Sequence, residues 1–124
     1  MMNHSRFTLA VASLLMFLGV LMGAFGAHAL EHRLSVEAQG WWQTAVHYQM
    51  IHGLALLALG ASRISGIDRA INALVLGIVI FSGSLYALAL TNIHWLGAIT
   101  PIGGLLMMVG WLMLVFQFWR GRVI

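Results

Sequence analysis

The sequence contains no cysteine, no lysine and a single proline, and it carries little charge of either sign. Without cysteine, the chain has no disulfide, no thiolate nucleophile, no iron–sulfur cluster and no cysteine-based zinc site. Charged residues make up 7% of its 124 residues, whereas soluble domains carry about 25%. Water is therefore not the solvent for most of this surface.

Long apolar runs take up most of the chain, and 61% of its residues are hydrophobic. A helix that crosses a hydrocarbon core of about 30 Å needs about 20 apolar residues. Four runs approach or exceed this length, at about residues 7–29, 44–62, 71–90 and 96–118. The sequence thus predicts a single all-α membrane domain, residues 1–124, built as a four-transmembrane-helix bundle.

The arginines alternate with these runs in a way that predicts orientation. Arg33 alone falls in the first or third connection, and the other arginines lie at the termini and in the second connection: Arg6, Arg63, Arg69, Arg120 and Arg122. Arginine-rich segments stay on the cytoplasmic side of a membrane. We therefore expect a multi-pass protein of the cell inner membrane with both termini in the cytoplasm. So scattered a set of arginines is not a nucleic-acid binding patch.

A cleavable signal peptide is the alternative interpretation of the first run, because Ala27-His28-Ala29 has the A-x-A form of a cleavage site. The run is longer than the apolar part of a signal peptide, which has about 7–15 residues. Three further spans are predicted after it. We therefore expect the first run to remain as a span.

Small residues recur along one face of the first predicted helix. Gly19, Gly23 and Ala27 follow one another at intervals of four, and Gly26 lies on the same side. Small residues let a second helix approach closely within a membrane. This face is predicted to be a helix-packing surface.

Polar residues concentrate in the half of the predicted bundle that faces away from the cytoplasm. At 1.5 Å per residue, His52 lies about 15 Å below Trp42, near the midplane, and Ser82 reaches a similar depth from the other side. We predict an outward-facing polar cluster in this half, made of His28, Glu31, His47, Tyr48, His52, Ser82, Tyr86 and Thr100.

The cluster has a structural and a functional interpretation, and the sequence leaves both open. Hydrogen bonds between helices stabilise membrane bundles by about 0.6 kcal/mol each. An ionisable residue inside a membrane is also a common mark of a transport or proton pathway. For His52 both interpretations apply.

The sequence gives little sign of an enzyme or of a cofactor-binding protein. The predicted spans contain no acid and no pair of nucleophile and base at a recognisable spacing, so we expect no catalytic residues. His28 and His32 have the i, i+4 spacing of many zinc sites, but the first helix is expected to end within Gly26 to Leu30. We expect no metal and no cofactor.

Four ordered motifs resemble one family. They are G-A-F-G-A-H at 23–28, W-x-Q-T-A-x-x-Y-Q-x-x-H ending at His52, F-S-G-S-L-Y at 81–86 and T-P-I-G-G at 100–104. Together they are similar to the domain-of-unknown-function 423 family, small bacterial inner-membrane proteins with similar proteins in animals. The resemblance covers about residues 6–119. It implies a small four-span membrane protein and carries no catalytic residue with it.

The sequence is therefore compatible with three functions. The first is a non-enzymatic accessory or assembly factor that contacts the lipid bilayer and a membrane-protein partner or a second copy of itself. The alternative is a small transporter or proton-coupled pathway that uses His52, Tyr48, Ser82 and Tyr86. The second alternative is a haem- or metal-binding redox membrane protein.

Overall fold

The computed structural model describes residues 4–121, and all regular structure in that range is helical. The elements are α1 (His4–His28), α2 (Val36–Ala61), α3 (Asp68–Thr91), the short 3₁₀ segment η1 (His94–Ala98) and α4 (Thr100–Trp119). The prediction of an all-α protein is confirmed for this range. Arg122, used above for orientation, lies outside the described residues.

Helix α2 begins well before the apolar run that predicted it. Ser35 is its N-cap, and the Ser35 hydroxyl accepts a hydrogen bond of 3.1 Å from the backbone N–H of Ala38. Such a cap satisfies one of the free N–H groups of the first turn. The helix therefore includes a polar first turn as well as the expected span.

Helices α3 and α4 also differ in detail from the expectation. Helix α3 begins before the expected run at 71, with Ile67 at its cap position and Asp68 in its first turn. Helix α4 begins at Thr100, after the start of the expected run at 96, and Ile99 takes its cap position. Pro101 does lie in the first turn of α4, where its missing N–H breaks no helical hydrogen bond.

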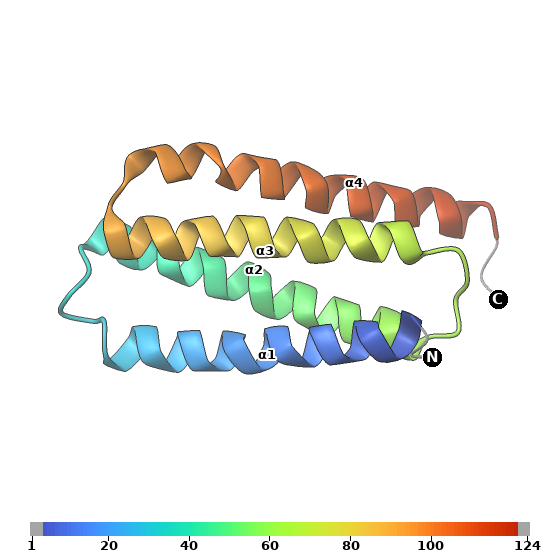
Figure 1. Cartoon of the computed structure of the whole chain (residues 1–124), viewed down its shortest axis with the longest axis horizontal. Coiled ribbons are helices and arrows are strands. Elements are labelled where there is room, and N and C mark those ends of the chain that lie inside the picture. The colour runs from blue at the N-terminus through green and yellow to red at the C-terminus, as the bar shows by residue number, and fades with distance from the viewer. Residues whose placement is uncertain (1–3, 122–124) are drawn as a thin grey trace.

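Each helix runs antiparallel to the one before it (Figure 1). Helix α2 packs against α1 and α3, and α3 packs against α4. In Figure 1, α1 and α4 form the two outer edges, with α2 and α3 between them. The segments that contain Arg6, Arg63, Arg69 and Arg120 lie together at one end of the molecule, and the segment with Arg33 lies at the other.

Three stretches are long and apolar enough to cross a membrane: Ser5–His28, Asp68–Thr91 and His94–Trp119. Their outer surfaces are apolar, as lipid contact requires; the side chains of Phe17 and Met108, for example, are 64% and 61% exposed. Helix α2 is not among these stretches, because glutamines and histidines make it less apolar than the other three.

Helices α3 and α4 approach closely enough for their backbones to touch. A Cβ atom added to Gly103 would lie 2.7 Å from the carbonyl oxygen of Gly77, and one added to Gly77 would lie 2.8 Å from the backbone nitrogen of Met107. Leu56 and Leu74 are fully buried in the core beside this contact. Glycine is therefore needed on both helices.

Candidate functional site

Gln49 connects three helices. Its side chain is 4% exposed, and its amide nitrogen donates a 2.8 Å hydrogen bond to the backbone oxygen of Leu15 in α1. Its amide oxygen accepts a 2.6 Å hydrogen bond from the Tyr86 hydroxyl in α3. Both ends of the amide are thus used inside the protein.

Two further bonds lie beside Gln49. The Ser82 hydroxyl donates to the backbone oxygen of Ala45 over 2.8 Å, and the Trp42 indole N–H donates to the backbone oxygen of Met22 over 2.8 Å. The rings of Trp42 and Tyr86 pack edge to face at 4.7 Å between centroids. We call Trp42, Gln49, Ser82 and Tyr86 the buried polar seam.

His52 lies outside the seam, between α2 and α4. Its Nδ1 is 2.9 Å from the backbone oxygen of Tyr48, and its Nε2 accepts a 3.0 Å hydrogen bond from the indole N–H of Trp111. A carbonyl oxygen only accepts and an indole N–H only donates. His52 is therefore a neutral imidazole with its proton on Nδ1, and neither ring nitrogen is left for another ligand.

Tyr48 and Thr100 belong to separate contacts. The Tyr48 side chain is 40% exposed; its ring packs on Phe81 and lies parallel to the His52 ring. The Thr100 hydroxyl bonds to the Ser84 hydroxyl over 2.6 Å and so joins α4 to α3.

A cavity of about 590 Å³ opens between the end of α1 and the first half of α2; we call it the α1–α2 cavity. The Gln39 side chain holds the connection beside it, through bonds to the backbone oxygens of Glu31 (2.8 Å) and Leu34 (3.1 Å). The lining residues are Gly23, Gly26, Ala27, Glu31, Leu34, Gln39, Trp42, Gln43, Val46, His47 and Met50.

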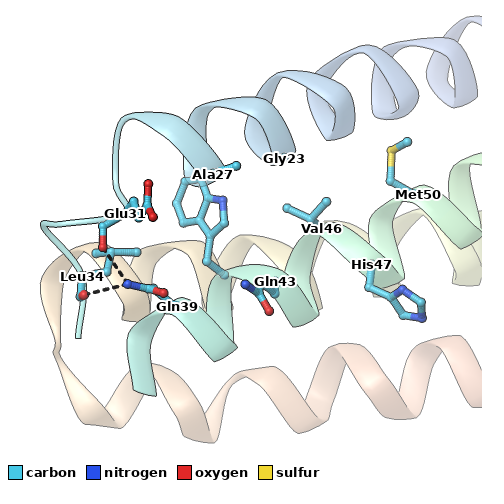
Figure 2. Close-up of a pocket in the computed structure, with 11 residues that line it drawn as sticks. Gly23, Ala27, Glu31, Leu34, Gln39, Gln43, Val46, His47 and Met50 are labelled. Atoms are coloured by element: carbon cyan, nitrogen blue, oxygen red, sulfur yellow. Dashed lines mark hydrogen bonds between the residues drawn. The ribbon is translucent and has the colours of Figure 1, made fainter. Parts of the chain in front are cut away.

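Figure 2 shows how this lining is arranged. Val46 and Met50 extend from α2 toward α1, and Gly23 and Ala27 present no large side chain opposite them. Glu31 lies where α1 ends, at the same end of the cavity as Gln39. The cavity thus has a polar end at the α1–α2 connection. Inside the helix pair, Val46 and Met50 face α1, and the His47 ring points away from α1.

The residues of the predicted polar cluster fall into several groups rather than one. Ser82 and Tyr86 join the seam, and His52 bonds to Trp111 of α4. Tyr48 packs on Phe81 of α3, and Thr100 bonds to Ser84 of α3. Glu31 and His47 line the α1–α2 cavity. His28 is exposed and is the last residue of α1.

The spacing of His28 and His32 does not produce one helical face, because α1 ends at His28 and His32 lies in the following turn. Within residues 4–121, no three His, Asp or Glu side chains are grouped to hold a metal ion. In the same range, every buried side-chain nitrogen or oxygen has a hydrogen-bond partner.

Five hydrogen-bonding side chains of the candidate site were not among the predicted site residues: Gln39, Trp42, Gln49, Ser84 and Trp111. Gln49 carried a usable signal, since an amide within a membrane helix needs partners for both ends. Trp111 carried none, because tryptophan is common in apolar helices, and only the packing of α4 brings it to His52.

Comparison with known proteins places the chain in a family. Residues 22–104 match the family described as "Protein of unknown function (DUF423)". No solved structure matches the chain.

Relatives from several bacteria carry a common name. A "UPF0382 membrane protein" of Staphylococcus saprophyticus is 59% identical over 99 residues, which cover 75% of this chain and 80% of that protein. The "UPF0382 membrane protein YwdK" of Bacillus subtilis is 46% identical, covering 79% of this chain and 84% of its own. The "UPF0382 inner membrane protein YgdD" of Escherichia coli strain K12 is 42% identical, covering 90% and 88%. The chain is therefore a membrane protein and belongs to the DUF423 family.

Proposed function

We propose that the protein crosses the membrane four times, with both termini in the cytoplasm. Helices α1 and α3 each have the length and composition of a span, and they run in the same direction. A chain that crosses twice in one direction has to return between the two crossings, and α2 is the segment that does so. The end that gathers Arg6, Arg63, Arg69 and Arg120 is then the cytoplasmic end.

The polarity of α2 is compatible with a span. Gln49 and His52 are its buried polar residues, and both are hydrogen-bonded inside the protein. A polar group enters a membrane at low cost when protein atoms replace its water. The average hydropathy of α2 counts these two residues as polar, but it takes no account of their hydrogen-bond partners inside the protein.

The proposed role is that of a non-enzymatic accessory or assembly factor, which acts by binding another membrane component. One observation carries this proposal: the hydrogen bonds of Gln49, Ser82 and His52 end on atoms of the protein itself. Such a network stabilises the helix arrangement. The surface left available to a partner is then the lipid-facing exterior and the α1–α2 cavity.

The transport alternative receives less support from the geometry. A proton pathway through His52 needs a free ring nitrogen, and both are engaged. Toward the arginine-rich end, the core contains Leu56, Leu74 and Leu114, which offer no group to carry a proton onward. Thr8 adds one buried hydroxyl there, which is not a chain of ionisable groups. The redox alternative needs a facing ligand for His52, where the structure places the indole of Trp111.

Purified protein with His52→Ala tests the packing role against transport. We expect a lower melting temperature in detergent, because the variant removes the acceptor of the Trp111 bond. Wild-type proteoliposomes are expected to show no more proton or solute flux than protein-free liposomes. His32→Ala, an exposed histidine outside the α1–α2 cavity, is the control and should melt like the wild type. Wild-type flux that His52→Ala abolishes without a change in melting temperature would contradict the proposal.

A further inference from the structure

We propose that the α1–α2 cavity binds one membrane lipid with an amine head group, held by Glu31 at the polar end. This inference rests on the four-span arrangement proposed above, and it names a ligand for the surface that the accessory role leaves open. Its basis is the match between the cavity and one lipid molecule in length, polarity and charge.

The length of the cavity matches one leaflet. From Gln39 to Met50 it follows α2 for about 16 Å at 1.5 Å per residue. Half of a hydrocarbon core of about 30 Å is about 15 Å. Glu31 lies just beyond the last residue of α1, which is the level of the lipid head groups. The cavity therefore runs from the membrane surface to about the midplane.

The polarity changes in the same direction as in a lipid. Glu31, Gln39 and Gln43 lie toward the α1–α2 connection, whereas Val46 and Met50 lie deeper and face α1 (Figure 2). His47 also lines the deeper part, but its ring points away from α1 (Figure 2). Trp42 lines the cavity next to Gln43 in α2, and an indole is well suited to the boundary between head groups and acyl chains. A polar head and an apolar chain fit this order, whereas a soluble polar metabolite leaves the deep end unfilled.

Small residues on α1 create the space. Gly26 lets the Trp42 ring lie directly against α1, which forms one wall of the cavity. Ala27 is exposed and lines the cavity, so only a methyl group extends from α1 at that point. The resulting volume of about 590 Å³ lies within the range of about 300–1,000 Å³ that is usual for small-molecule sites.

The charge of the lining selects the head group. Among the described residues that line the cavity, Glu31 is the one with a formal charge. A carboxylate forms a short, charge-assisted hydrogen bond with an ammonium group, and it repels the phosphate of a lipid without a compensating amine. The site therefore favours phosphatidylethanolamine over phosphatidylglycerol.

Native mass spectrometry of the full chain in detergent, with either lipid added, tests this preference. We expect one bound phosphatidylethanolamine per protein, with an occupancy several-fold above that of phosphatidylglycerol. Glu31→Gln should lower the first occupancy to the level of the second. Glu37→Gln is the matched control, since Glu37 is exposed in the first turn of α2 and does not line the cavity. Equal occupancy of the two lipids in the wild type would overturn the inference.

A second variant tests the location. Ala27→Phe fills the cavity from an exposed position, so we expect it to melt like the wild type and to lose most of the bound lipid. Ala10→Phe, at an exposed position nearer the start of α1, should keep the lipid. Lipid binding unchanged by Ala27→Phe, or a stoichiometric partner helix in place of lipid, would contradict the proposal. Loss of this site alone leaves the four-span arrangement standing, because that arrangement is tested by labelling the two ends of α2.

Discussion

The Gln49 side chain is hydrogen-bonded to both helices that pack against α2, namely α1 and α3. Its amide contacts the backbone of α1 and the Tyr86 hydroxyl of α3. Backbone carbonyls of a helix already accept one hydrogen bond and can accept a second. The amide thus ties α1 to α2 without disturbing the helix of α1.

Replacing Gln49 by leucine should destabilise the protein by about 1–2 kcal/mol, because two bonds are lost and the Tyr86 hydroxyl keeps no partner. Tyr86→Phe in the same background removes that unpaired hydroxyl, so the double variant should lose less than the sum of the single losses. Reversible unfolding in mixed micelles measures all three. Gln43→Leu, an exposed glutamine of the same helix, should change stability little. Additive losses from Gln49→Leu and Tyr86→Phe would show that the bond does not couple them.

The sequence predicts which of these residues turn inward better than it predicts their partners. His52 and Ser82 are both buried, but they were expected at one depth. In the structure, Ser82 bonds to Ala45, about two turns along α2 from His52. Counting residues gives the position of a side chain along its own helix. The axial shift between neighbouring helices depends on packing, which one sequence does not display.

At the scale of helices, two kinds of glycine contact hold the molecule together. Between α3 and α4, Gly77 and Gly103 bring backbone against backbone. Between α1 and α2, Gly19 and Gly26 receive the side chains of Met50 and Trp42. Close approach matters here because helices in a membrane associate largely through packing.

Gly103→Ala should push α3 and α4 apart and cost about 1–3 kcal/mol, the usual penalty for overfilling a packed contact. The added methyl group has no room, since it would meet the backbone of Gly77 and Phe81. Gly104→Ala is the matched control: its nearest neighbour would be a Phe81 ring carbon at 3.9 Å. There the methyl group should leave stability unchanged or raise it by up to about 1 kcal/mol, since alanine favours a helix. Equal losses from both variants would contradict the backbone contact.

For the small-residue face of α1, the sequence predicts the small residues but not which of them a neighbouring helix packs against. Gly19 and Gly26 lie against large side chains of α2, as a packing surface requires. Gly23 and Ala27, from the same predicted face, line the α1–α2 cavity instead. Small residues only leave space. Whether a neighbour fills that space depends on the side chain opposite, and Val46 lies at ordinary contact distance from a Cβ on Gly23, 3.5 Å.

At the scale of the whole molecule, the membrane arrangement depends on α2. The apolar runs predicted the number and type of helices in the described range, because run length is a strong signal in a chain with so little charge. They did not predict how polar α2 becomes at its start, where Ser35 caps it and Glu37 lies in the first turn. If α2 crosses the membrane, the arginines gather on one side of it, the polar residues of α2 are hydrogen-bonded inside the protein, and the α1–α2 cavity lies within one leaflet.

Cysteine labelling measures this crossing most directly, because the chain has no cysteine of its own. Val36→Cys and Ala61→Cys place single thiols at exposed positions at the two ends of α2. In spheroplasts, a membrane-impermeant maleimide should label Val36→Cys at once and Ala61→Cys only after permeabilisation. Labelling of both positions from the same side would contradict a crossing by α2 and with it the four-span arrangement.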